Sequence, residues 1–159
     1  MKLFEVLDRT IQYKWLTQGR ELSMAEFEVG GKIIRVEFHF MQQGQPEEYD
    51  PSAPKSTIDI SFNTRPIRGA SEYYDEDEEP DYKITGGGSE YEIFATVMRI
   101  VFEYVKKNKP NAISFTADDD EPSRVKLYDR FVKRFTASGY KLWKREAAHQ
   151  GVMWILKKS

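Results

Sequence analysis

The sequence has no cysteine, so disulfide bonds, thiolate nucleophiles and thiolate metal sites are all excluded. Its two histidines, His39 and His149, stand far apart in the chain without metal-ligand spacing, and no metal is expected. No apolar run approaches the roughly 20 residues of a membrane-spanning helix. The first residues, Met1 to Arg9, are too charged for a signal peptide. We therefore expect a protein that is neither secreted nor membrane-spanning.

An excess of positive charge is also missing. The formal net charge is −2, so the composition does not favour nucleic acid as a partner. Hydrophobic residues make up 40% of the 159 residues and aromatic residues 14%, which is enough for one core in a single domain over residues 1–159. The stretch around residues 66–81 is strongly acidic, and we expect it to form a mobile, solvated loop.

The clearest local pattern is a β-hairpin over residues 22–41. Two alternating segments, Leu22–Val29 and Lys32–Met41, flank Gly30-Gly31, which suits a two-residue turn of the primed type. Closing the hairpin on this turn places Glu26 opposite Arg35 on a polar face. The apolar residues then share the other face, so one register satisfies both sides of the sheet.

Hydrophobic periodicity predicts the remaining elements. Strands are expected over residues 11–15, 56–63, 111–117, 140–147 and 152–158, and main helices over 89–107 and 122–137. Residues 2–8 suit a short helix or a ragged strand, and the helix is the preferred interpretation. Ser89 and Glu92 form a capping box at the start of the first main helix, and Pro122 suits the first turn of the second. This order predicts an α+β domain with one twisted mixed β-sheet and two main helices packed on it.

A glycine-rich loop precedes the first main helix and consists of Lys83, Gly86, Gly87, Gly88 and Ser89 with the residues between them. Glycines let the backbone approach an anion, and the free amides at a helix start attract one, so the loop is a candidate phosphate cradle. A tight strand-to-helix turn explains the same residues. Short glycine patterns do not separate the two interpretations.

Tyr128, in the middle of the second main helix, is a candidate general acid, because a phenol can protonate a leaving group. It also lies on the apolar face with Phe131 and Phe135, where a tyrosine usually belongs to the core with its hydroxyl at the rim. The residue taken alone favours the core interpretation. His39 is expected on the polar side of its strand, and no Ser/His/Asp arrangement is evident.

The elements after residue 82 resemble the C-terminal half of the GNAT acyltransferase superfamily. Lys83-Ile84-Thr85-Gly86-Gly87-Gly88 is similar to its pyrophosphate loop, (Arg/Gln)-x-x-Gly-x-(Gly/Ala), and Ser123–Tyr128 is similar to its tyrosine-bearing helix. The resemblance implies a donor site for acetyl-coenzyme A at Lys83, Gly86, Gly87, Gly88 and Ser89. It also implies that Tyr128 protonates the departing thiolate, while Asp59 or Glu37 accepts the proton of the amine.

A closer resemblance covers roughly residues 82–140. Ile84-Thr85-Gly86, Phe94–Val97 and Glu121–Arg130 are similar to segments of a family of small proteins of tailed bacteriophages. This resemblance implies a phage or prophage origin and a location in the virion or the host cytoplasm. It implies no particular activity.

Two features depart from the GNAT pattern. GNAT enzymes place two helices between their first and second strands, but only Thr17–Arg20 is available for that connection here. The largely acidic stretch Arg65–Asp81 precedes the glycine loop, where negative charge would repel a pyrophosphate. A degenerate GNAT-like scaffold is therefore expected.

Two hypotheses of function follow. The first is a non-catalytic phage protein, either a virion component or a host-directed binding protein, with a protein as its partner and no cofactor. The alternative is a coenzyme A-dependent N-acyltransferase that uses acetyl-coenzyme A. The sequence leaves the oligomeric state open.

Overall fold

A computed structural model of the chain describes residues 10–42, 52–66, 90–118, 122–148 and 151–159. The strands are β1 (Lys14–Gln18), β2 (Leu22–Val29), β3 (Lys32–Gln42), β4 (Ser56–Pro66), β5 (Ala112–Asp118), β6 (Tyr140–Ala148) and β7 (Gly151–Lys158). The helices are α2 (Glu90–Asn108) and α3 (Pro122–Ala137). The short helix predicted over residues 2–8 lies outside the described residues.

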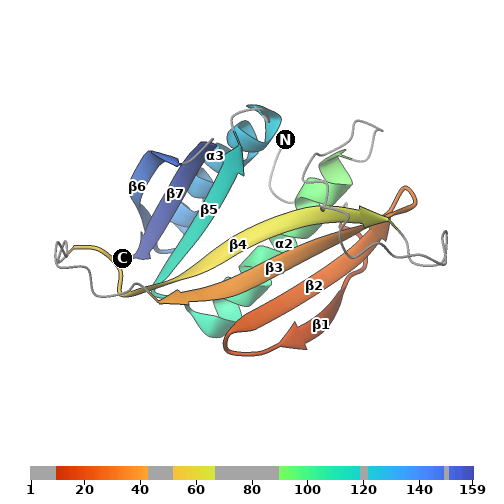
Figure 1. The fold of residues 1–159 in the computed structure, drawn as a ribbon, viewed down its shortest axis with the longest axis horizontal. Coiled ribbons are helices and arrows are strands. Elements are labelled where there is room, and N and C mark those ends of the chain that lie inside the picture. The colour runs from red at the N-terminus through yellow and green to blue at the C-terminus, as the bar shows by residue number, and fades with distance from the viewer. Residues whose placement is uncertain (1–9, 43–51, 67–89, 119–121, 149–150) are drawn as a thin grey trace. The chain divides into compact units, whose positions relative to one another are not determined.

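The seven strands form one mixed sheet in the order β1-β2-β3-β4-β5-β7-β6 (Figure 1). Strands β4 and β5 are parallel, and their connection contains α2. Strand β7 is antiparallel to both β5 and β6. The predicted α+β class, with one mixed sheet and two main helices, is confirmed in the described residues.

The described residues form two compact units. One is drawn from Met1–Glu37 and Phe62–Lys106, and the other from Phe38–Ser61 and Lys107–Ser159. That residues 1–159 form a single domain stays a prediction.

The first unit contains the predicted hairpin. Gly30 and Gly31 have φ angles of 56° and 76°, the left-handed conformation that a primed two-residue turn needs at both central positions. The predicted opposite-charge pair is also present, because Arg35 Nη2 lies 3.3 Å from Glu26 Oε2. The register predicted from the two faces of the hairpin therefore agrees with the structure.

Helix α2 lies on one face of β2 and β3 (Figure 1). Its predicted apolar stripe is buried throughout and consists of Ile93, Phe94, Val97, Met98, Val101, Tyr104 and Val105. Ala95, Thr96 and Ile100 lie off this stripe and are also fully buried. The chain before β1 contacts this second side of α2, because the Ile11 amide donates a 2.8 Å hydrogen bond to Thr96 Oγ1.

This contact also corrects the first predicted strand, which was expected over residues 11–15. Strand β1 begins only at Lys14 and runs to Gln18. Ile11 is bonded to α2 through Thr96, and the Tyr13 hydroxyl donates to the Glu103 carboxylate of the same helix. The alternation of apolar and polar residues therefore begins at Ile11, before the segment that pairs with β2.

The second unit is built on an aromatic core between α3 and strands β5 and β7 (Figure 1). The Phe115 ring stacks on the Phe131 ring with a centroid distance of 5.7 Å, and Phe135 lies 6.0 Å from Phe115. Trp154 is fully buried, and its indole Nε1 donates a 2.9 Å hydrogen bond to Asp129 Oδ1. That bond satisfies the one polar atom of the largest core side chain.

Most of the residues that alternation and helical periodicity place in the core are buried, namely Phe27, Val36, Phe38, Ile60, Phe94, Val97, Val101, Phe115, Tyr128, Phe131 and Phe135. Val125, which periodicity places on the same apolar face of α3, is only partly buried. The predicted end of α3 is also confirmed, because Gly139 has a φ angle of 95° directly after the last turn.

Candidate functional site

Tyr128 lies in the aromatic core of the second unit. Its side chain is 1% exposed. The ring stacks on Phe115 at a centroid distance of 5.2 Å and forms a T-shaped contact with Trp154 at a centroid distance of 5.5 Å. The structure therefore surrounds the candidate general acid with packed aromatic rings.

The position of Tyr128 follows from helical periodicity. Phe131 and Phe135 stand three and seven residues further along α3, so all three rings project from one side of the helix. Phe131 is 1% exposed and Phe135 is fully buried. The stripe explains the burial of Tyr128 without any catalytic role.

Asp59 projects from β4 on the sheet face opposite Ile58 and Ile60, because successive side chains of a strand alternate. The parallel register pairs Asp59 with Ser114 of β5. Ser114 Oγ donates a 3.0 Å hydrogen bond to Asp59 Oδ1, and Ser114 itself is only 6% exposed. One of the two predicted base candidates thus has a buried hydroxyl as its partner.

Burial raises the pKa of the Asp59 carboxyl above its ordinary value of 3.8. The hydrogen bond from Ser114 and the electrostatic interaction with His39 act in the opposite direction and lower the pKa of Asp59, but burial has the largest effect. A carboxylate with a raised pKa accepts a proton more readily than one on the surface. Asp59, Ser114 and His39 therefore form a carboxylate-centred polar cluster, named here the Asp59 cluster.

The sequence missed this cluster, since no Ser/His/Asp arrangement was expected. Alternation along β3 and β4 does predict that His39 and Asp59 lie away from the apolar face of the sheet. Ser114 joins them only because β4 and β5 pair in one particular parallel register, which local sequence does not contain. The hydroxyl donates directly to the carboxylate, so Ser114 orients the base rather than acting as a histidine-activated nucleophile.

We expect the Asp59 cluster to make stability depend on pH in a defined direction. The folded pKa exceeds the unfolded value, so the folded state holds the proton more tightly. The proton bound to Asp59 therefore stabilises the folded state relative to the unfolded state. This contribution is fully present below pH 3.8 and is lost as pH rises through the pKa of Asp59 in the folded state. The free energy of unfolding of the wild type should therefore fall relative to that of Asp59→Asn over this window.

Urea denaturation at a series of pH values measures this difference. Glu146→Gln, which makes the same acid-to-amide change at an exposed position on β6, provides the matched control. Wild-type and Asp59→Asn curves that stay parallel from below pH 3.8 to neutral pH would contradict the burial of this carboxyl.

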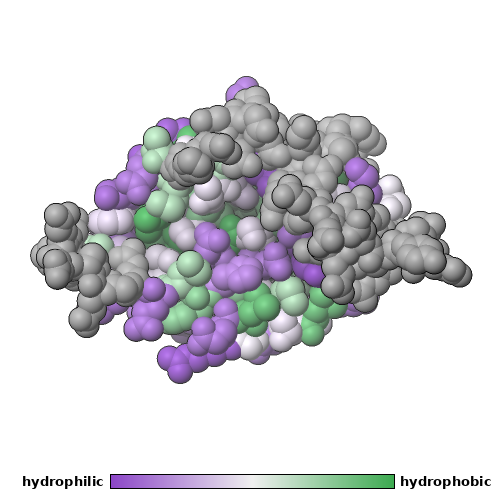
Figure 2. Space-filling model, in the orientation of Figure 1, coloured by the Kyte–Doolittle hydropathy of each residue, from purple (hydrophilic) through white to green (hydrophobic). Residues whose placement is uncertain are grey.

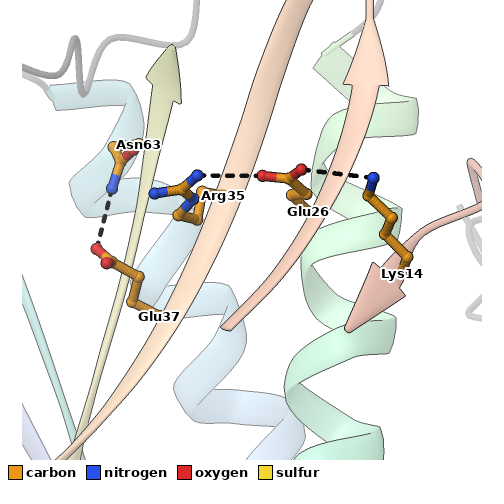
Figure 3. Close-up of polar contacts among 5 residues, drawn as sticks. All are labelled: Lys14, Glu26, Arg35, Glu37 and Asn63. Carbon is orange, nitrogen blue, oxygen red and sulfur yellow. Dashed lines mark hydrogen bonds and ion pairs between the residues drawn. The ribbon is translucent and has the colours of Figure 1, made fainter. Parts of the chain in front are cut away.

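Glu37, the other predicted base, belongs to a row of polar side chains on the first unit (Figure 3). Its Oε2 accepts a 3.2 Å hydrogen bond from Nδ2 of Asn63, which is fully buried. Glu26 lies further along this row between Arg35 and Lys14, whose Nζ is 3.9 Å from Glu26 Oε1. Glu37 therefore satisfies a buried amide.

The predicted phosphate cradle, made of Lys83, Gly86, Gly87, Gly88 and Ser89, lies outside the described residues. Almost all of the predicted acidic loop, about residues 66–81, lies outside them as well. Among the residues that the structure describes, no group of three or more His, Cys, Asp or Glu side chains is placed to hold a metal ion. None of the helices in those residues has the length and apolar character needed to cross a bilayer.

Comparison with known proteins adds no family. No protein-family model matches the chain, and no curated protein matches it.

Proposed function

We propose that this chain is a phage-encoded, non-catalytic binding protein, either a virion component or a host-directed protein, on a degenerate GNAT-like scaffold. The observation that carries the proposal is the position of Tyr128. A general acid must reach the leaving sulfur of the donor. A phenol ring that is 1% exposed and packed between Phe115 and Trp154 supports a core role instead.

The connectivity supports the scaffold part of this proposal. Helix α2 joins the parallel strands β4 and β5, α3 follows, and an antiparallel hairpin of β6 and β7 ends the chain. This is the order that the GNAT resemblance implies. Strand β1 ends at Gln18 and β2 begins at Leu22, which leaves no room for the two acceptor-side helices of the enzymes.

The strand order supports a protein as the partner. Strands β1 and β6 are the two edges of the sheet, and each carries a leucine, Leu16 or Leu142, that is 41% exposed. The outer side of an edge strand presents backbone donors and acceptors that another chain can pair with. Figure 2 shows hydrophobic residues among the hydrophilic ones on the face turned to the viewer.

A turnover assay tests the proposal. The full chain is incubated with acetyl-coenzyme A and a mixture of primary amines, namely polyamines and lysine-containing peptides, and release of the free thiol is followed. We expect release no faster than in protein-free buffer, and no change on Tyr128→Phe. Protein-dependent release that falls about a hundredfold or more on Tyr128→Phe, as loss of a general acid predicts, would overturn the proposal.

The second candidate function is a coenzyme A-dependent N-acyltransferase, and the Asp59 cluster is the observation that favours it. In this alternative, Asp59 accepts the proton of the amine and Ser114 orients the carboxylate. Acetyl-coenzyme A would bind at the glycine loop around Gly86–Gly88, and Tyr128 would protonate the thiolate. The same assay separates the two candidates, because Asp59→Asn then lowers thiol release at neutral pH.

A further inference from the structure

A groove of about 410 Å³ opens in the first unit beside the start of β1. Residues 12–14 line one side, and residues 26–28 together with Ile33 line the other. Its volume falls within the range of about 300–1,000 Å³ that is typical of ligand sites. The groove thus lies where the chain before β1 separates from β2.

The groove is open because the two segments are held apart. The last registered pair of β1 and β2 in the described residues is Lys14 with Glu26, although β2 continues to Val29. The chain before Lys14 is bonded to α2 instead, through Tyr13 and Glu103 and through Thr10, whose Oγ1 accepts a 3.1 Å bond from Arg99 Nη1.

The hydrogen bonds that hold the chain before Lys14 on α2 persist at neutral pH. Burial and the hydrogen bond to Glu103 raise the pKa of Tyr13 to about 12, so its hydroxyl stays protonated and continues to donate. The Trp15 indole Nε1 donates a second, 3.2 Å bond to the other oxygen of Glu103. Among the described residues, β1 is not registered with β2 beyond Glu26, and Phe27 and Glu28 line the groove instead.

The charges of the groove favour a cation. Its lining contains one lysine, Lys14, and two glutamates, Glu26 and Glu28, so one negative charge is in excess. Glu26 is already bonded to Arg35, and Lys14 is nearby (Figure 3). Glu28 lies two residues further along the same face of β2 and is exposed, so its carboxylate is available to an incoming positive charge.

We propose that the groove binds an extended, basic segment of a partner protein, which adds as a strand along residues 27–29 of β2 and places a Lys or Arg side chain on Glu28. Strand addition to a sheet edge uses backbone hydrogen bonds for affinity and alternate side chains for specificity. The inference rests on the proposed binding role. It is tested by peptide binding and not by coenzyme chemistry, so either proposal can fail without the other.

The test uses two capped heptapeptides of alternating threonine and valine, one with a central lysine and one with a central glutamate. Each is titrated into the isotope-labelled full chain at millimolar concentration, and backbone amide shifts are followed by NMR. We expect the lysine peptide to shift the amides of residues 27–29 and to bind about tenfold more tightly than the glutamate peptide, because one attractive ion pair replaces one repulsion.

Variants at exposed positions assign the effect to the groove. Glu28→Lys should reverse the preference between the two peptides, and Lys14→Gln should strengthen binding of the lysine peptide. Glu146→Gln, on β6, is the matched control and should leave both affinities unchanged. Equal binding of the two peptides, shifts confined to β6, or no shift with either peptide would overturn the proposal.

Discussion

Replacing Phe131 by alanine should lower the free energy of unfolding by about 3–5 kcal/mol, the range found when a large core aromatic is truncated. Phe131 is 1% exposed, and its ring lies parallel to that of Phe115, with an interplanar angle of 1°. The substitution removes both the buried area and the ring contact. It also leaves a cavity between α3 and β5 that rigid neighbours only partly fill.

Urea denaturation of the full chain, followed by circular dichroism, measures this loss. Leu142→Ala provides the control, since Leu142 is 41% exposed on the edge strand β6 and should cost less than about 1 kcal/mol. A loss below about 1 kcal/mol for Phe131→Ala as well would contradict the aromatic core.

Tyr128 should behave as a core residue in the same measurement. Tyr128→Ala is expected to cost about 3–5 kcal/mol, because the ring packs against Phe115 and Trp154. Tyr128→Phe keeps the ring and removes only the hydroxyl, so it should cost no more than about 1.5 kcal/mol, the net value of an ordinary hydrogen bond.

The contrast between the two variants separates the two interpretations of this residue. An acid that lines an open cleft contributes little to packing, so truncating it to alanine would cost little stability. A loss below about 1 kcal/mol for Tyr128→Ala would therefore contradict the core assignment of Tyr128.

Features that depend on neighbouring residues were predictable from the sequence. The Gly30-Gly31 turn fixed the hairpin register, and the predicted pair of Glu26 and Arg35 is present. The stripe that begins at Ile93 predicted the buried face of α2 correctly. Turn geometry and side-chain periodicity are local properties, so the sequence contains them directly.

Features that depend on distant residues were not predictable in the same way. Strand β1 starts later than alternation suggests, because Tyr13 bonds to Glu103, ninety residues further along the chain. Ser114 reaches Asp59 across fifty-five residues and only in the observed register of β4 and β5. The groove beside β1 and the Asp59 cluster both result from such pairings, and neither has a sequence pattern of its own.

The candidate site was predictable only in part. Periodicity correctly placed Tyr128 on the apolar face of α3, and its candidate role as a general acid came from the chemistry of a phenol and from the resemblance to acyltransferases. Asp59 was proposed as a base from that resemblance, whereas its raised pKa follows from burial beside Ser114. Glu37 was proposed on the same ground and stays a prediction, and its bond from the buried Asn63 amide was not predictable from local sequence.

Binding of acetyl-coenzyme A to the full chain tests the central claim, that this scaffold does not act as an acyltransferase. A ligand present at about a hundred times its Kd stabilises the folded state by about 2.7 kcal/mol, which is readily seen as a rise in Tm. We predict no rise in the Tm of the wild type, and no calorimetric heat of binding, at millimolar acetyl-coenzyme A. A rise in Tm that is present in the wild type and lost on Gly88→Glu would contradict this account and favour the enzyme.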